Sequence, residues 1–210
     1  MSLLPDPIGV YAILDAGLVG AEGLPGAAEA MACAGIRVFQ VRGKSLCAGS
    51  LEALVLSVRS VLPGDALLIV NDRADVALET GADGVHVGDD DLPVEEVRRV
   101  LPASAVVGRS THSIDEIRRL SALECDYVGF GPVFESTTKQ TGYHPHGLEG
   151  LRRACLASSR PVVAIGGIGV DVIGAVREAG ASGVAMISGL LASKDVGGIA
   201  SRAVGEFFGR

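Results

Sequence analysis

The side chains best suited to bind a charged group lie in the segment 130–139, which reads FGPVFESTTK. The apolar run Tyr127–Phe130 predicts a β-strand that ends at a Gly-Pro pair, and the hydroxyls of Ser136 and Thr138 follow with the ammonium group of Lys139. Hydroxyl donors beside a mobile cation suit a phosphate or a diphosphate. A polar surface loop with an ordinary lysine would have the same sequence pattern. Similar segments elsewhere in the chain are therefore needed to support an anion site here.

Six other segments also place polar residues or glycines at the end of an apolar run. In chain order they are Gln40, Arg42 and Lys44; Asn71, Asp72 and Arg73; Asp89, Asp90 and Asp91; Arg109, Ser110, Thr111 and His112; Gly166 and Gly167; and Ser188 and Gly189. Helix capping would explain single members, such as Asp72 or Asp91. It does not explain so many groups that mix cations with acids.

Short, β-branched apolar runs must position these groups. The predicted strands are Gly9–Leu14, Ile36–Val41, Leu67–Val70, Gly84–Val87, Ala105–Gly108, Tyr127–Phe130, Val162–Ile165 and Gly183–Ile187. Near-continuous apolar runs suit parallel strands that are covered on both faces. Eight strand–helix units in 210 residues predict one domain over residues 1–210, a (β/α)8 TIM barrel with its active site where the strands end.

Segments rich in Ala, Leu and Glu lie between the strands at helical period, for example 93–101 and 113–123. Pro93 suits the first position of a helix, and Ser113 with Glu116 forms a capping box. Helices are also predicted to end at glycines in the left-handed conformation, namely Gly35, Gly81 and Gly180.

Composition narrows the class of protein. The chain is 48% hydrophobic and only 4% aromatic, so a large core must be built from aliphatic side chains. No apolar run reaches the roughly 18 to 20 residues of a membrane span, and the start lacks the basic region of a signal peptide. A net charge of −7 argues against a nucleic-acid partner. Four scattered cysteines without a C-x-x-C pair favour a reducing cytoplasm over disulfides or zinc.

Two anion sites are indicated by residue type. Gly167 and Ser188 follow the seventh and eighth strands, where backbone amides at a helix start form the usual phosphate site of a barrel. Asp72 and Asp91 offer hard oxygen ligands, and two carboxylates with phosphate oxygens typically hold Mg²⁺.

The cations Arg42, Lys44 and Lys139 remain for a second, more highly charged group. Two such sites imply two anionic substrates or one bisphosphate.

The four histidines are less informative. His86 lies inside an apolar strand and is predicted to be a hydrogen-bonded histidine of the core or rim. His112 suits a substrate contact and an ordinary loop equally well. His144 and His146 lack a third ligand nearby, which favours a solvated loop over a metal site. Without a Ser-His-Asp or Cys-His arrangement, the chemistry is expected to rest on charge stabilisation rather than a covalent intermediate.

Seven motifs in order span Gln40 to Ser188. They read QVRGK, VNDR, GADGVHVGDDDL, GRSTHS, DYVGFGPVFESTTK, PVVAIGGI and GVAMIS. In this order they resemble the motifs of thiamine-phosphate synthases. The resemblance implies a TIM-barrel transferase that joins 4-amino-2-methyl-5-hydroxymethylpyrimidine diphosphate to a thiazole phosphate, releases diphosphate and uses Mg²⁺.

The resemblance also implies roles for individual residues. The pyrimidine diphosphate would be held by Gln40, Arg42, Lys44, Asn71, Ser110 and Lys139. The Mg²⁺ ligands would be Asp72 and Asp91. The thiazole phosphate would be held by Ser136, Thr138, Gly167, Ile187 and Ser188. The catalytic set would be Arg42, Lys44, Ser110 and Lys139.

This chain departs from the family pattern at two positions. Asp89 stands where the family usually has Gln, which adds an acid beside the predicted metal site. Ser136 stands where the family usually has Thr, which keeps the hydroxyl group.

The chemistry implied is dissociative. The pyrimidine amino group can feed electrons into the ring while the carbon–oxygen bond to diphosphate breaks, and the thiazole nitrogen then attacks that carbon. The protein would stabilise the leaving group with Mg²⁺ and cations and align the two substrates.

Three alternatives stay open at this stage. The first is a thiazole tautomerase-like isomerase, which should lack the full set of diphosphate cations and metal acids. The second is another phosphosugar isomerase of barrel fold, for which we find no clear acid–base pair. The third is a barrel without catalytic activity that binds thiamine phosphate. The sequence also leaves open whether the chain forms a homo-oligomer.

Overall fold

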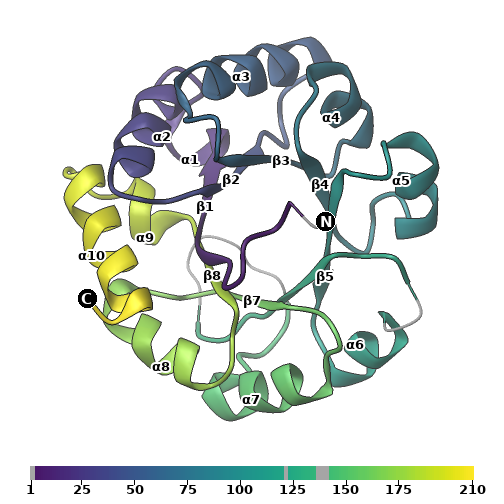
Figure 1. Cartoon of the computed structure of the whole chain (residues 1–210), viewed down its shortest axis with the longest axis vertical. Coiled ribbons are helices and arrows are strands. Elements are labelled where there is room, and N and C mark those ends of the chain that lie inside the picture. The colour runs from purple at the N-terminus through teal and green to yellow at the C-terminus, as the bar shows by residue number, and fades with distance from the viewer. Residues whose placement is uncertain (1–2, 121–122, 136–141) are drawn as a thin grey trace.

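Eight parallel strands close into a barrel with the helices outside it (Figure 1). The computed structural model describes residues 3–120, 123–135 and 142–210. The strands are β1 (Gly9–Asp15), β2 (Val38–Arg42), β3 (Leu67–Asn71), β4 (Gly84–Val87), β5 (Val106–Thr111), β6 (Tyr127–Phe130), β7 (Val162–Ile165) and β8 (Gly183–Met186). Each strand pairs with its sequence neighbours, and β8 pairs with β1. The predicted TIM barrel is confirmed.

Helices follow the strands around the ring. They are α1 (Ala16–Val19), α2 (Leu24–Cys33), α3 (Ala48–Val61), α4 (Ala74–Thr80), α5 (Val94–Val100), α6 (Ile114–Leu120), α7 (Gly147–Ala157), the 3-10 helix η1 (Val170–Val172), α8 (Ile173–Glu178), α9 (Ser188–Leu191) and α10 (Val196–Phe208). In the described part of the chain, no helix is long and apolar enough to cross a membrane.

The local signals for helix ends are largely confirmed. At the start of α6, the Glu116 amide donates to the Ser113 hydroxyl, which is one half of the predicted capping box. The Glu116 carboxylate accepts from the Ser113 hydroxyl and from the His112 amide, one residue before the position that the motif predicts. The predicted left-handed glycines all have positive φ, 101° at Gly35, 64° at Gly81 and 102° at Gly180. Pro93 was predicted to be the first residue of a helix. It is instead the N-cap of α5, one position before the first helical residue.

The strand prediction was wrong at the end of β5. The strand was expected to stop at Gly108, but it continues to Thr111 because Arg109, Ser110 and Thr111 pair with β6. Ser110 is therefore fixed inside a strand and is not part of the loop that follows.

Two apolar cores hold the barrel together. The larger lies between the strands and the surrounding helices, and the smaller fills the barrel interior. The inner core includes Ile8, Tyr11, Ile69, Tyr127 and Val163. The segment before β1 contributes Ile8, whose amide donates to the Ser182 hydroxyl before β8 at 3.3 Å. This segment crosses the centre of the ring (Figure 1), so it covers the end of the barrel at which the strands begin. The end at which the strands finish is not covered by this segment, so a functional site can form there.

Candidate active site

A cavity of about 100 Å³ lies inside the barrel toward the carboxyl ends of the strands. Because side chains alternate along a strand, every second residue points into this space. Its lining includes five residues predicted from the sequence, namely Gln40, Arg42, Asn71, Ser110 and Ile187. These residues come from β2, β3, β5 and the position directly after β8, so closure of the barrel brings together side chains that are far apart in the sequence.

Asp15 also lines this cavity, and the sequence did not indicate it. It ends β1, is 6% exposed, and forms an ion pair with the Arg42 guanidinium. Its other carboxylate oxygen accepts from the Gly17 amide at 2.8 Å and caps α1. Asp15 therefore holds Arg42 in place at the cavity wall. The only signal in the sequence was an acid at a strand end, which also suits a helix cap.

Lys44 and Asp72 meet at the rim. The Lys44 ammonium lies 2.8 Å from an Asp72 carboxylate oxygen. The pKa of Asp72 is raised from its ordinary value by burial; Lys44 opposes this rise, and the carboxylate of Asp91 adds to it. The two predicted metal ligands thus lie close enough to affect each other. Asp91 itself accepts from the Gly88 amide at 2.7 Å.

The backbone of Asp72 is strained. Its φ is 65°, and among the described residues no other non-glycine residue has a positive φ. The left-handed conformation costs an L-residue roughly 1–2 kcal/mol, although Asp and Asn tolerate it best. Such strain tends to persist at functional sites, where the surrounding structure holds it in place.

A hydrogen-bonded chain of five side chains crosses the barrel interior. The Gln40 amide nitrogen donates to the Tyr11 hydroxyl at 2.8 Å, and the Tyr11 and Tyr127 hydroxyls are 2.9 Å apart. The Tyr127 hydroxyl lies 2.9 Å from His86 Nδ1, and His86 Nε2 lies 2.9 Å from the Ser110 hydroxyl. The prediction of His86 as a hydrogen-bonded residue is confirmed. The two tyrosines were missed because an aromatic residue in an apolar strand usually indicates only a core position.

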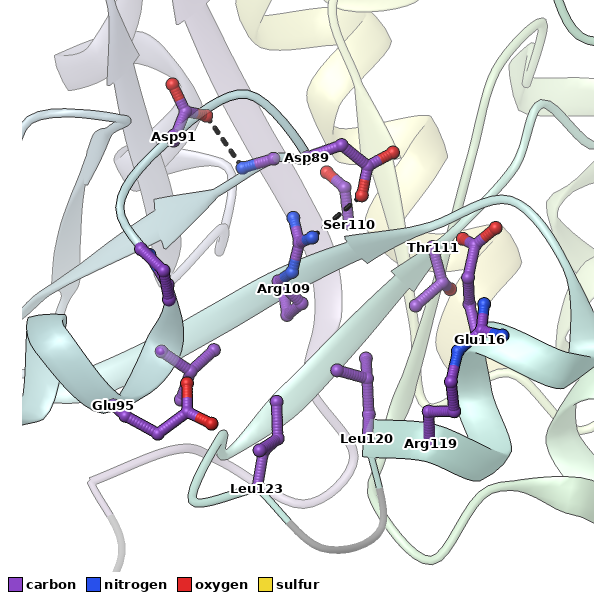
Figure 2. Close-up of a pocket in the computed structure, with 13 residues that line it drawn as sticks. Asp89, Asp91, Glu95, Arg109, Ser110, Thr111, Glu116, Arg119, Leu120 and Leu123 are labelled. Carbon is purple, nitrogen blue, oxygen red and sulfur yellow. Dashed lines mark hydrogen bonds and ion pairs between the residues drawn. The ribbon is translucent and has the colours of Figure 1, made fainter.

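Arg109 points away from that chain. Figure 2 shows its guanidinium beside the Asp89 carboxylate. The two groups are 2.7 Å apart and line a cleft of about 340 Å³ bordered by α5 and α6. Asp89, the acid that departs from the family pattern, is thus paired with a cation. Thr111 is buried and donates to the Gly129 carbonyl, so it has a structural role.

The region predicted to hold a phosphate is only partly described. Ser136, Thr138 and Lys139 lie outside the described residues. Gly167 has φ 65°, and an added Cβ would lie 2.2 Å from the Glu135 carbonyl oxygen. A side chain at Gly167 would therefore collide with the segment after β6, so a substitution there would not report on phosphate alone. Ser188 begins the short helix α9, directly after Ile187.

The remaining histidines lie beside β6 and the segment after it. His112 donates from Nδ1 to the Gly131 carbonyl at 2.7 Å and stacks on Tyr143, while His146 packs against Phe130. Within residues 3–120, 123–135 and 142–210, no three potential ligands cluster around a metal position.

Comparison with known proteins identifies the family. The family model described as thiamine monophosphate synthase matches residues 10–190. The chain belongs to the thiamine monophosphate synthase family. It is 43% identical to the thiamine-phosphate synthase of Anaeromyxobacter dehalogenans over 190 residues, which cover 90% of this chain and 86% of that protein. It is 38% identical to the thiamine-phosphate synthase of Albidiferax ferrireducens over 89% of this chain and 85% of that one.

Solved structures agree with this assignment. The thiamine phosphate pyrophosphorylase from Pyrococcus furiosus superposes with a TM-score of 0.87 and 32% identity, over 97% of each chain. A geranylgeranylglyceryl phosphate synthase from Thermoplasma acidophilum superposes with a TM-score of 0.75 at 16% identity, which shows a shared fold alone. Family membership therefore rests on the matches with higher identity.

Proposed function

We propose that this chain is a thiamine-phosphate synthase. It joins 4-amino-2-methyl-5-hydroxymethylpyrimidine diphosphate to 4-methyl-5-(2-phosphooxyethyl)thiazole and releases diphosphate. The bond between the exocyclic carbon of the pyrimidine and the diphosphate oxygen breaks, and its electron pair leaves with diphosphate. The lone pair of the thiazole nitrogen forms the new carbon–nitrogen bond. That nitrogen carries no proton, so no general base is required.

The observation that carries this proposal is the meeting of cations and acids at one rim of the barrel. Asp72 interacts with both Lys44 and Asp91, and Arg42 lies in the cavity wall. An isomerase of a thiazole phosphate would not require this set. The relatives reported above are named thiamine-phosphate synthase, and this chain matches most of the length of each.

Asp72 and Asp91 are suited to hold Mg²⁺. Two neighbouring carboxylates, one with its pKa raised by burial and by the other, gain from a divalent cation between them. When bound, Mg²⁺ would neutralise charge on the departing diphosphate. Lys44 and Arg42 supply further positive charge on the same side, and Arg42 is held for that role by Asp15.

Gln40, Asn71 and Ser110 are proposed to bind the pyrimidine end of the first substrate. Gln40 is 2% exposed and lies within β2, so its amide group is held in one position. Lys139 is proposed as a further cation for the diphosphate. Ser136, Thr138, Gly167, Ile187 and Ser188 are proposed to hold the thiazole phosphate, by their positions in the family motifs.

The decisive assay supplies both substrates, with and without Mg²⁺, and measures thiamine phosphate and diphosphate. We expect both products in equal amounts and only when Mg²⁺ is present. Conversion of a thiazole tautomer without use of the pyrimidine diphosphate would support the isomerase instead. Tight binding of thiamine phosphate without turnover would support a barrel that only binds it.

The proposal also covers the place in which the enzyme works and its partners. We propose that the enzyme works in the cytoplasm on small-molecule substrates, without a membrane or nucleic-acid partner. The acidic composition and scattered cysteines support this proposal.

A further inference from the structure

The interior chain has one hydrogen bond whose direction is set by its atoms, at Gln40, and three in which either atom could donate. The Gln40 amide nitrogen has only protons to offer, and it donates to the Tyr11 oxygen. Tyr11 has one proton, and the partner placed to accept it is the Tyr127 oxygen at 2.9 Å. Burial raises the pKa of both tyrosines, so each keeps its proton at neutral pH.

With Tyr11 as the donor to Tyr127, the tautomer of His86 follows. The Tyr127 oxygen accepts from Tyr11, so the Tyr127 proton goes to His86 Nδ1 at 2.9 Å. A nitrogen that accepts carries no proton, so the imidazole proton is on Nε2. Nε2 in turn donates to the Ser110 oxygen at 2.9 Å.

We propose that this series of hydrogen bonds makes Ser110 a fixed hydrogen-bond donor toward the substrate. Tyr11, Tyr127 and His86 act as positioning residues. Because the Ser110 oxygen accepts from His86, its own proton is directed to an acceptor in the cavity. The proposal rests on the proposed function, in which that acceptor is a nitrogen or oxygen atom of the pyrimidine diphosphate. At the other end, Gln40 donates from its nitrogen, so its carbonyl oxygen is left to accept.

Packing keeps the chain in one arrangement. Tyr11 is 2% exposed and Tyr127 is 1% exposed. An added Cβ at Gly108 would lie 2.2 Å from Tyr127 Cζ and 2.5 Å from His86 Nδ1, so only glycine leaves room for the contact between these two rings. The rings are tilted by 33° with centroids 5.4 Å apart.

Nitrogen-15 NMR of the histidine side chains in the wild-type protein tests the direction of the chain without an activity measurement. The His86 signal is assigned as the one missing from His86→Gln. We expect a neutral ring with a protonated Nε2 and an unprotonated Nδ1. A protonated Nδ1 would reverse the three bonds between Ser110, His86, Tyr127 and Tyr11 and overturn the inference, even if the protein were an active synthase.

Tyr127→Phe breaks the chain in the middle and removes one oxygen. We expect His86 to lose its single tautomer and show both. We also expect kcat to fall at least about fivefold, in line with the coupling energies of residues in one hydrogen-bond network. Tyr143→Phe removes the same atom outside the chain and is the matched control, expected to leave the His86 signal unchanged.

A double-mutant cycle with Ser110→Ala shows whether Tyr127 acts through Ser110. If it does, adding Tyr127→Phe to Ser110→Ala lowers kcat by less than about twofold. A further loss as large as in the wild-type background would mean that Tyr127 acts by another route, and the inference would fail. A wild-type protein without synthase activity would overturn the proposed function, while the NMR result would still decide the direction of the chain.

Discussion

Replacement of Asp72 by Asn separates the chemistry of the rim from the stability of the barrel. Asn tolerates positive φ about as well as Asp, whereas Ala would add roughly 1–2 kcal/mol of strain at a φ of 65°. Asp72→Asn removes the charge and leaves the backbone in place. It is therefore a sharper change than Asp72→Ala.

The stability effect can be worked out from the ion pair and the pKa. The lost pair with Lys44 is worth about 0–1 kcal/mol, because the Lys44 side chain is 54% exposed. In the opposite direction, the pKa of Asp72 is raised by burial and by Asp91. The folded protein therefore binds more protons than the unfolded chain just above the ordinary pKa, and the free energy of unfolding falls as pH rises through that window. Asn removes this penalty, so at pH 7 without metal we expect the two proteins to differ by less than about 1 kcal/mol.

The functional effect should be much larger. Loss of one group that stabilises charge in a transition state typically lowers kcat by about 100- to 1,000-fold. We expect a loss of that size for Asp72→Asn, measured as diphosphate release over a range of Mg²⁺ concentrations. Asp90→Asn is the matched control, since Asp90 is an exposed acid next to Asp91, and it should retain wild-type activity.

Thermal unfolding gives a second measurement that does not depend on turnover. Mg²⁺ with diphosphate at about 100 times its Kd should stabilise the wild-type protein by about 2.7 kcal/mol. For a domain of this size that raises Tm by about 5–10 °C. Asp72→Asn should shift by less than about 2 °C at the same concentrations. Near-wild-type turnover at low Mg²⁺, or an undiminished Tm shift, would refute Asp72 as a ligand.

Three other substitutions have distinct expected outcomes. Asp15→Asn should lower the free energy of unfolding by about 2–3 kcal/mol in denaturant titrations and raise KM for the pyrimidine diphosphate, because Arg42 loses its buried counter-charge. Gly108→Ala should cost about 1–3 kcal/mol in the same titrations, because its Cβ would collide with Tyr127. Lys139→Ala should lower kcat by about 100- to 1,000-fold in steady-state kinetics, with partial recovery in Lys139→Arg, whereas a change within about threefold would exclude the proposed role.

The barrel was predictable because its signals are local and repeated. Most strands are short apolar runs, and several helices stop at a glycine with positive φ. The end of β5 was not predictable in this way. Arg109, Ser110 and Thr111 are polar and read as a loop, yet their pairing with β6 continues the strand. A local pattern contains no information about the neighbouring strand that supplies those hydrogen bonds.

The candidate site was predictable where polar residues interrupt apolar runs. Gln40, Arg42 and Asn71 stood out for that reason, and they line the cavity. Asp15 stood in an equally suitable position but also suited a helix cap, and it serves both purposes. Tyr11 could not be distinguished from a core residue, since its ring is buried and only its hydroxyl takes part in the polar chain.

The site divides into two parts that differ in how firmly the fold holds them. Gln40 and Ser110 lie within strands and are joined through the barrel interior, so their positions vary little. Lys44 and Asp91 lie in loops after the strands, where long side chains and a metal ion can adjust to a charged group. Rigid elements hold a constellation more accurately than loops do. In the proposed reaction this division is useful, because the pyrimidine ring has to stay aligned for attack while the diphosphate moves away from it.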